Sequence, residues 1–387
     1  MKISDRGINL TPSEPRKIYD EAQKYSGVID LTLGDPDLPP PENVKKAAAD
    51  AAITGKTRYS ANAGLLELRK KIAEEAQNEY GFDFDPENEI IVTVGAMEAA
   101  YLSLWGLLNP GDEALIVAPF WINYREVVKS LGAVPVFVNT REEDDFVVRP
   151  DEIEKKITPA TKVLIINSPA NPTGAVIPGN ILDEIAAIAL KYDLTVISDE
   201  IYSHLVYDDQ KVESIITRPG MRERTVVING FSKRYAMTGY RIGWALAPAD
   251  LIRVMTQMTE NIVACAPLTS QYAAIEALSA QTDEAYIRRE FEKRRNCVME
   301  EIAGTEGISC AGIPATFYGF INVSASGLSG EEFAMALLRS KQVALVYGSA
   351  YGGAYYKDFV RIAFTMNCDK LREAFRRIRE FLAERKK

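Results

Sequence analysis

A lysine and an arginine within one short stretch are the residues of this chain that could most directly do chemistry together. The stretch NGFSKRYAMTGYRIGW runs from residue 229 to 244, and Arg241 follows Lys233 by eight residues. A lysine amine can form a Schiff base with an aldehyde, and a guanidinium can bind a phosphate or carboxylate through two parallel hydrogen bonds. The stretch therefore indicates a reactive amine close to an anion-binding site.

Other polar and aromatic residues follow apolar runs that alternate with helical patterns. EIIVTV is followed by Gly95, Ala96 and Met97, DEALIVAP by Trp121, VLIINSP by Asn171, and LTVIS by Asp199 and Tyr202. This alternation predicts parallel βαβ units, in which ligands bind beyond the carboxyl ends of the strands. We therefore expect all these residues to meet at one edge of a sheet.

Together these groups match the chemistry of pyridoxal 5′-phosphate. Trp121 could stack on the ring, and Asp199 could keep the ring nitrogen protonated so that the ring accepts electrons. Tyr202 and Asn171 could donate hydrogen bonds to the phenolic oxygen. The aldehyde requires a lysine, which Lys233 supplies.

The phosphate of this cofactor needs backbone amides and a cation. The helix that begins at Gly95, Ala96 and Met97 offers free N–H groups and the positive end of its dipole. Arg241 supplies the guanidinium. The two features together predict a phosphate site beside the lysine.

The elements that must position these residues predict an α/β protein of 387 residues. We expect a three-layer large domain with a mainly parallel central sheet, and a smaller α/β domain formed by the C-terminal part and the N-terminal arm. The predicted ranges are 1–45 for the arm and part of the small domain, 46–284 for the large cofactor-binding domain, and 285–387 for the small domain.

Composition excludes several other functions. The formal net charge is −9, which argues against nucleic acid or an anionic membrane surface as partner. His204 is the only histidine, so a multi-histidine metal site is impossible and we expect no metal. The four cysteines lack paired or metal-like spacing, and no signal peptide or membrane-spanning run is visible, so we expect a cytoplasmic protein.

The sequence resembles the fold-type I pyridoxal-phosphate-dependent aminotransferases of class I/II, in the aspartate aminotransferase-like subgroup, over essentially its whole length. The matching segments are LTLGDPD, RYSANAGLLELR, VGAMEA, NSPANPTG, SDEIYSHLVYD, NGFSKRYAMTGYRIGW and VRIAF. The lysine segment and the Asn-Pro-Thr-Gly segment are the specific signals. Their occurrence in order with the Asp-Glu-x-x-Tyr element argues against a chance match.

The resemblance implies the transfer of an amino group from an L-amino acid to a 2-oxo acid, 2-oxoglutarate, by a ping-pong mechanism. Lys233 would hold the cofactor and then move the proton at the substrate Cα. Arg361 would bind the substrate α-carboxylate, assisted by Asn171 and the backbone of Gly34, with Trp121 bordering the substrate.

The resemblance also implies a homodimer. Tyr59 would reach the cofactor phosphate of the neighbouring subunit, and the segment LTPSEPRKI at residues 10–18 would close over the substrate. The active site would then include Tyr59 from the neighbouring subunit and residues 10–18 from the N-terminal arm.

Three positions depart from the family pattern. Gly230 stands where many relatives have a serine that contacts the phosphate, and Ser232 could compensate. Met97 stands where relatives that favour aspartate can carry a lysine for the distal carboxylate. Aspartate is therefore doubtful as the amino donor, and the sequence favours an aromatic or aliphatic amino acid instead. Arg234, beside the lysine, is expected to be solvated.

Three other functions compete with transamination. A pyridoxal-phosphate-dependent carbon–sulfur β-lyase would use the same lysine. A non-catalytic regulatory protein would ordinarily need an appended module, and the whole chain is used by the expected fold. A nicotinamide-dependent dehydrogenase would need a G-x-G-x-x-G turn, where VGAMEA stands instead. The sequence leaves the preferred donor and the pathway open.

Overall fold

The computed structural model describes residues 2–3, 8, 14–279, 282–283 and 285–385 of the chain. Its main sheet has the strand order β2-β8-β7-β6-β5-β3-β4. The strands are β2 (Ile90–Thr93), β3 (Glu113–Ala118), β4 (Val134–Asn139), β5 (Thr161–Asn167), β6 (Thr195–Asp199), β7 (Thr225–Gly230) and β8 (Gly243–Leu246). The pairs from β4 to β7 are parallel, and β8 runs antiparallel to both of its neighbours. The mainly parallel sheet predicted from the sequence is thus confirmed.

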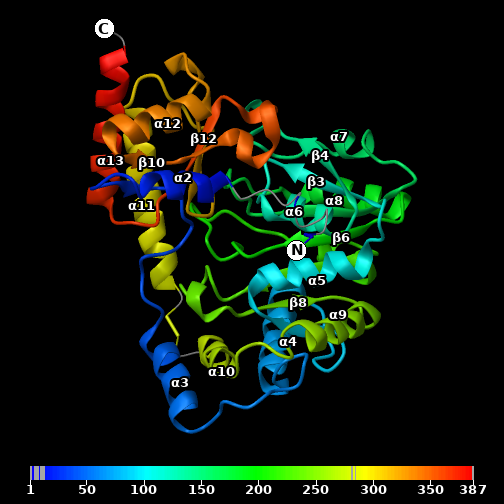
Figure 1. The fold of residues 1–387 in the computed structure, drawn as a ribbon. Helices are drawn as coiled ribbons and strands as arrows, with labels where there is room; N and C mark the ends of the chain where they lie inside the picture. Colours follow the sequence, from blue (N-terminus) through cyan, green and yellow to red (C-terminus); the bar gives the residue numbers. More distant parts are fainter. Residues whose placement is uncertain (1, 4–7, 9–13, 280–281, 284, 386–387) are drawn as a thin grey trace.

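Helices cover both faces of this sheet (Figure 1). They are α3 (Glu42–Ile53), α4 (Leu66–Tyr80), α5 (Gly95–Leu107), α6 (Asn123–Ser130), α7 (Pro150–Glu154), α8 (Gly179–Lys191), α9 (Ala249–Ile262) and α10 (Leu268–Ala277). Ile165 of β5 packs in one hydrophobic cluster with residues of α5 and α9, whereas the adjacent Leu164 packs in another with residues of α8. Because successive strand residues point to opposite faces, the sheet separates two cores.

A second group of elements combines the two ends of the chain. Its strands are β1 (Ile29–Asp30), β9 (Tyr318–Asn322), β10 (Val343–Ala344), β11 (Val346–Tyr347) and β12 (Phe359–Ala363). Its helices are α2 (Glu14–Ala22), α11 (Ala285–Ala303), α12 (Gly330–Lys341) and α13 (Cys368–Arg385). The pairing of β1 with β10 brings the N-terminal segment against the C-terminal part, and α2 lies beside β10 and β11 (Figure 1). The predicted boundaries at 45 and 284 remain a prediction, and residue 284 lies outside the described residues.

Short 3₁₀ helices connect these elements. They are η1 (Glu142–Asp144), η2 (Ile215–Thr217), η3 (Arg222–Arg224), η4 (Thr238–Tyr240), η5 (Ser324–Ser326), η6 (Gly348–Tyr351) and η7 (Gly353–Tyr356).

Local sequence signals explain several element ends. Gly81 ends α4 in the left-handed conformation with a φ of 77°, as its position after the helical pattern predicts. Ser329 begins α12 with a capping box that it shares with Glu332. None of the helices in the described part of the chain has the length and apolar character that crossing a bilayer requires.

Candidate active site

A cleft of about 610 Å³ opens at the carboxyl ends of β5, β6 and β7, between the main sheet and the second group of elements. Residues predicted from the sequence that line it are Gly34, Ala96, Met97, Trp121, Asn171, Asp199, Tyr202, Ser232, Lys233, Arg241 and Arg361. Parallel strands place their carboxyl ends at one edge, which is why segments far apart in the chain meet here.

Lys233 follows the end of β7, and its amine points into the cleft. Its Nζ donates a hydrogen bond to the backbone carbonyl of Gly34 at 2.7 Å. Burial lowers the pKa of Lys233 to about 8, with nearby carboxylates opposing and nearby guanidinium groups reinforcing that effect. A substantial neutral fraction at physiological pH makes this lysine a competent nucleophile and base.

Asp199 is a buried carboxylate at the cleft end of β6, only 4% exposed. Its Oδ1 accepts a hydrogen bond from the amide of Ile201 at 3.1 Å, and its Oδ2 accepts one from the hydroxyl of Tyr124. Burial raises the pKa of Asp199 to about 6, while these hydrogen bonds and Lys233 oppose the rise. The carboxylate has no ion-pair partner in the described part of the chain, so a cationic group of a ligand would stabilise it.

Trp121 lines the cleft next to Tyr124. The two rings meet edge to face, with centroids 5.3 Å apart and an interplanar angle of 87°. Tyr124 is thus held both by this contact and by its hydrogen bond to Asp199. The arrangement leaves Trp121 as an aromatic wall beside a buried carboxylate, which suits a flat heterocycle.

Tyr202 and Asn171 are both buried at the cleft. The Tyr202 hydroxyl lies 3.3 Å from that of Tyr318. The backbone amide of Asn171 donates to Asn167 Oδ1 at 2.8 Å, and Asn171 itself lines the cleft. The Tyr202 hydroxyl donates to Tyr318 here and would have to turn to donate to a ligand, whereas the Asn171 side-chain oxygen accepts from Arg361 and leaves its N–H groups as donors.

Arg361 is a buried cation that has no carboxylate partner among the described residues. Its side chain lies on β12, 5% exposed, with the guanidinium 4.5 Å from the ring centroid of Tyr318 and 5.1 Å from that of Tyr351. Its Nη1 donates to Asn171 Oδ1 at 3.3 Å and its Nη2 to the carbonyl of Thr32, whereas its Nε lacks an acceptor. Such a group is a binding site for an anion.

Arg241 lies against the start of α5. A Cβ atom added to Gly95, whose φ is 74°, would stand 2.5 Å from Arg241 Nη2, so only glycine lets the guanidinium approach this helix end. The first-turn amides of residues 95–97 have no acceptor within the helix. Guanidinium and helix dipole therefore converge on one anion site, and Gly95, although absent from the cleft lining, belongs to it.

The structure gives a physical reason for glycine at position 230. Gly230 of β7 pairs with Gly243 of β8, and a Cβ at Gly230 would stand 2.9 Å from the Cα of Gly243. A Cβ at Gly243 would in turn stand 2.5 Å from the amide of Ala96. A serine at position 230 would push β8 against α5, whereas Ser232 is accommodated at the cleft surface.

Tyr59 lies away from the cleft of its own chain. Its side chain is 85% exposed. The expectation that it enters a neighbouring subunit stays a prediction. Residues 10–13 of the expected closing segment lie outside the described residues, and only its continuation belongs to α2.

Arg234 corrects an expectation. It is not solvated: its guanidinium forms an ion pair with Glu75, and both side chains are largely buried. Glu75, Glu79 and His204 form the one cluster of potential metal ligands among the described residues. Since Arg234 already provides the cation there, the cluster is better explained as an ion-pair network than as a metal site.

Several cleft residues carried no usable signal in the sequence. Tyr318 and Tyr351 line the cleft from the C-terminal part, Asp35 lines it from a loop, and Thr238 lines it from η4. Tyr318 stands in a run of aromatic and apolar residues that predicts a buried strand, so nothing in the sequence marks its ring as facing a ligand. Asp35 stands in LTLGDPD, a short segment that matches the family but is not specific by itself.

Comparisons with known proteins agree with this geometry. The family model "Aminotransferase class I and II" matches residues 26–378. The chain is 40% identical over 389 residues to aromatic-amino-acid aminotransferase 2 of Thermococcus litoralis, and 40% identical over 389 residues to the aspartate aminotransferase of Pyrococcus abyssi, covering 100% of each chain. The solved aspartate aminotransferase of Thermus thermophilus with maleate superposes with a TM-score of 0.93 at 34% identity, covering 98% of this chain and 100% of that one.

Proposed function

Because the chain belongs to the family of class I and II aminotransferases, we propose that it transfers the amino group of an L-amino acid to 2-oxoglutarate at the cleft beside Lys233. The protein is an aminotransferase, and its family implies pyridoxal phosphate as cofactor. We further propose a ping-pong reaction, in which the donor leaves as an oxo acid before the acceptor enters. The carbon–sulfur β-lyase alternative is not favoured, since the relatives at 40% identity are named aminotransferases.

Three features of the cleft support the fit of pyridoxal phosphate. The carboxylate of Asp199 is buried and forms no ion pair with any described residue, which suits a protonated ring nitrogen. Arg241 and the start of α5 converge where only glycine fits at position 95, which suits a phosphate. Trp121 offers an aromatic face in the same cleft. The residues present therefore match the charged and flat parts of the cofactor.

When bound, pyridoxal phosphate supplies an aldehyde that captures amines and a protonated ring that accepts the electron pair left when the substrate Cα loses its proton. Lys233 would hold the cofactor, and its neutral amine would then accept the proton at the substrate Cα. The neutral form of the amine is accessible near physiological pH, because burial lowers its pKa to about 8.

The remaining cleft residues bind and orient. Asp199 would keep the ring nitrogen protonated, and Tyr202 and Asn171 would donate to the phenolic oxygen. Trp121 covers one face of the ring and also borders the substrate. The groups that would bind the phosphate are Arg241, the amides of Gly95, Ala96 and Met97, the hydroxyl of Ser232 and, in a homodimer, Tyr59 of the partner subunit.

The substrate α-carboxylate binds Arg361. This side chain is the observation that carries the proposal, since its guanidinium is buried beside the lysine amine and has no carboxylate partner in the part of the chain that the structure describes. A bidentate contact from an incoming carboxylate would satisfy the orphaned Nε. Asn171 and the backbone of Gly34 lie beside this guanidinium and assist it.

We propose an aromatic or apolar amino acid, rather than aspartate, as the preferred donor. The cations that line the cleft are Lys233, Arg241 and Arg361, and each is committed to another group in the proposed reaction. Met97 and Ile122 contribute apolar surface instead. The names of the relatives include both aspartate and aromatic aminotransferases, so the identity of the donor rests on this charge balance.

The test is chemical labelling followed by a panel of donors. Borohydride reduction of the purified enzyme should attach a pyridoxyl group to Lys233, and peptide mapping should find the label on that residue. Label on another lysine would contradict the assignment. Phenylalanine, tyrosine, leucine and aspartate should then be compared as donors with 2-oxoglutarate. Pyruvate and ammonia released from cystathionine without any oxo acid would revive the lyase alternative.

A further inference from the structure

The segment from Thr32 to Asp35, called the 32–35 segment below, lines the cleft and accepts four hydrogen bonds, three through backbone carbonyls and one through the Asp35 side chain. The donors are, in order, Arg361 Nη2 to the carbonyl of Thr32, Thr365 Oγ1 to that of Leu33 at 3.1 Å, Lys233 Nζ to that of Gly34 at 2.7 Å, and Thr238 Oγ1 to the carboxylate of Asp35 at 2.7 Å. The segment thus joins the two functional cations, Arg361 and Lys233, through the carbonyls of Thr32 and Gly34, which are two residues apart.

Steric contact fixes the path of the 32–35 segment. A Cβ atom at Gly34 would stand 1.8 Å from the hydroxyl of Tyr318, so the segment is pressed against this ring. The same ring lies under the guanidinium of Arg361. Movement of either cation therefore requires a change in contacts that the 32–35 segment makes.

Asp35 ties the end of this segment to the phosphate end of the cleft. Its Oδ1 accepts from the hydroxyl of Thr238, and the backbone carbonyl of Thr238 accepts from Arg241 Nη1 at 2.8 Å. Thr238 belongs to η4, which directly precedes Arg241. A continuous chain of contacts therefore runs from the carbonyl that holds the lysine amine to the guanidinium at the phosphate site.

Four charged groups act on the amine of Lys233: the carboxylates of Asp35 and Asp199 and the guanidinium groups of Arg241 and Arg361. Asp35 is the strongest of these, after burial itself. Asp199 already accepts hydrogen bonds from Tyr124 and Ile201, whereas the one side-chain donor to Asp35 is Thr238 among the described residues. Asp35 is therefore the carboxylate whose charge is most available to the lysine.

We propose that Asp35 is a positioning residue for Lys233: held by Thr238, its charge keeps the lysine amine on the carbonyl of Gly34 until a ligand occupies the cleft. The proposal rests on the role of Lys233 proposed above. When a phosphate and a carboxylate neutralise Arg241 and Arg361, the balance of charge at the amine shifts, and Asp35 limits how easily the amine gives up its proton. Asp35 contacts neither the cofactor nor the substrate in this proposal and acts through Lys233 and Thr238.

The test measures the reactivity of Lys233 in the full-length protein stripped of cofactor. Acetylation by acetic anhydride, a small reagent that reacts with neutral amines, should be followed at Lys233 by peptide mass spectrometry between pH 6 and pH 10. The midpoint of the rate profile should lie near 8 in the wild type, where the pKa of Lys233 is about 8. Asp35→Asn keeps an acceptor for Thr238 but removes the charge, and it should lower the midpoint by about half a pH unit or more.

Companion variants separate the charge from the tether. Asp35→Glu restores the charge and should return the midpoint toward the wild-type value. Thr238→Val removes the hydrogen bond but leaves the carboxylate, so it should move the midpoint less than Asp35→Asn does, and Thr238→Ser should reverse its effect. Asp37→Asn is the matched control, because Asp37 is two residues away and pairs with Arg294 at 2.6 Å.

A midpoint that is the same in Asp35→Asn and the wild type, or one that Asp37→Asn lowers equally, would overturn the proposal. A second reading, the pH profile of the rate at which pyridoxal phosphate attaches to the stripped protein, should move in the same direction by absorbance. The acetylation experiment contains no cofactor. Acetylation therefore tests the role of Asp35, and borohydride labelling tests the role of Lys233. Each experiment can fail while the other succeeds, so the two failures are distinguishable.

Discussion

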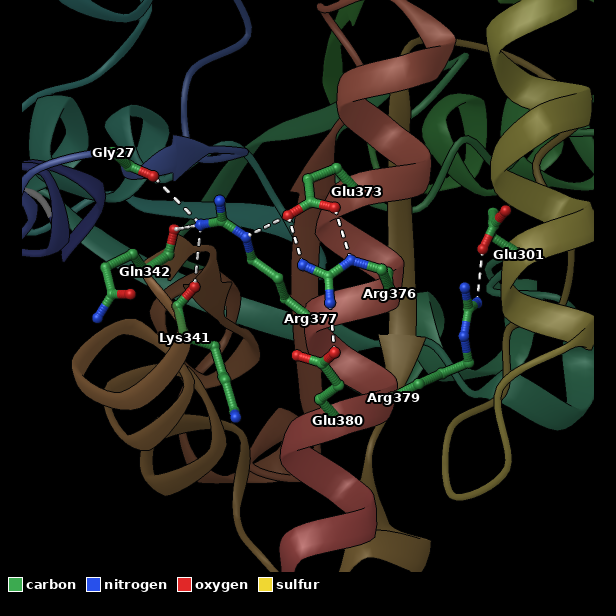
Figure 2. A network of polar contacts seen from close by, with 9 residues as sticks. All are labelled: Gly27, Glu301, Lys341, Gln342, Glu373, Arg376, Arg377, Arg379 and Glu380. Atoms are coloured by element: carbon green, nitrogen blue, oxygen red, sulfur yellow. Dashed lines mark hydrogen bonds and ion pairs between the residues drawn. The ribbon is translucent and has the colours of Figure 1, made fainter.

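Two sets of arginines in this protein have opposite surroundings. On helix α13, the guanidinium groups of Arg376, Arg377 and Arg379 all contact carboxylates (Figure 2). Arg376 bridges Glu373 and Glu380, Arg377 pairs with Glu373 at 2.8 Å, and Arg379 pairs with Glu301 at 2.6 Å. In the cleft, by contrast, neither Arg361 nor Arg241 has a carboxylate within the described residues, and both contact backbone carbonyls.

The difference separates arginines whose charge is already paired within the protein from arginines whose charge can bind a ligand anion. The hydrogen bonds from Arg376 and Arg377 lower the pKa of Glu373 to about 2, which is what a satisfied pair does to its acid. Such exposed pairs contribute little to stability, because water already screens both charges. The buried Arg361 instead gains most when an anion arrives, since the cost of burying this cation is already present in the ligand-free protein.

The sharpest way to break this comparison is to remove the buried cleft arginine. Arg361→Ala should lower kcat/KM by about 10³-fold for every amino donor alike, because each donor carries the α-carboxylate. Steady-state kinetics with phenylalanine, leucine and aspartate provide the measurement. A loss confined to aspartate would mean that Arg361 binds the distal carboxylate instead. Arg361→Lys should recover only part of the activity, since an ammonium lacks the planar fork.

Removal of the second cleft arginine should weaken the cofactor rather than the substrate. Arg241→Ala should raise the dissociation constant of pyridoxal phosphate by about 10- to 100-fold, because one charge-assisted contact to the phosphate is lost while the α5 amides remain. Absorbance titration of the stripped protein measures this constant. Activity should return at high cofactor concentration, and a loss that added cofactor cannot reverse would assign Arg241 to another role.

A cation added to the cleft should bind a ligand anion, as we expect of Arg361 and Arg241. Met97→Lys would place an ammonium in the cleft wall beside Asn123, where the carboxylates among the described lining residues are Asp35 and Asp199. The ratio of kcat/KM for aspartate to that for phenylalanine should rise by about tenfold, as a distal carboxylate gains a partner. Met97→Leu is the matched control and should leave the ratio within a factor of about two. An unchanged ratio in the lysine variant would place the side-chain subsite elsewhere.

The smallest effect is expected on α13. Arg376→Ala removes two exposed ion pairs, and it should leave kcat/KM within about twofold and the melting temperature within about 3 °C of the wild type. Thermal unfolding followed by circular dichroism, together with the standard assay, tests both values. A large loss of activity would show that pairing with carboxylates does not separate structural arginines from functional ones in this protein.

Part of the cleft could be predicted because its residues are local to strand ends. Asn171, Asp199 and Lys233 each follow an apolar run, and parallel strands bring their carboxyl ends to one edge. The glycine at position 230 could be noticed but not explained. Its reason is the close approach of Gly243 to the start of α5, which depends on how β8 packs.

What the sequence alone determined is the chemistry at the strand ends: an aromatic face, an amine, a carboxylate, an amide, a phenol and one guanidinium group. The segments that carry these groups also resemble one family of aminotransferases, and this resemblance implied the role of Arg361. Only the tertiary structure decided how these groups stand toward one another. Arg361 contacts Thr32, which is 329 residues away, and it lies between Tyr318 and Tyr351. Burial, pairing and the low pKa of Lys233 arise from such distant contacts, because the electrostatics of a group depend on everything that packs around it rather than on its neighbours in the chain.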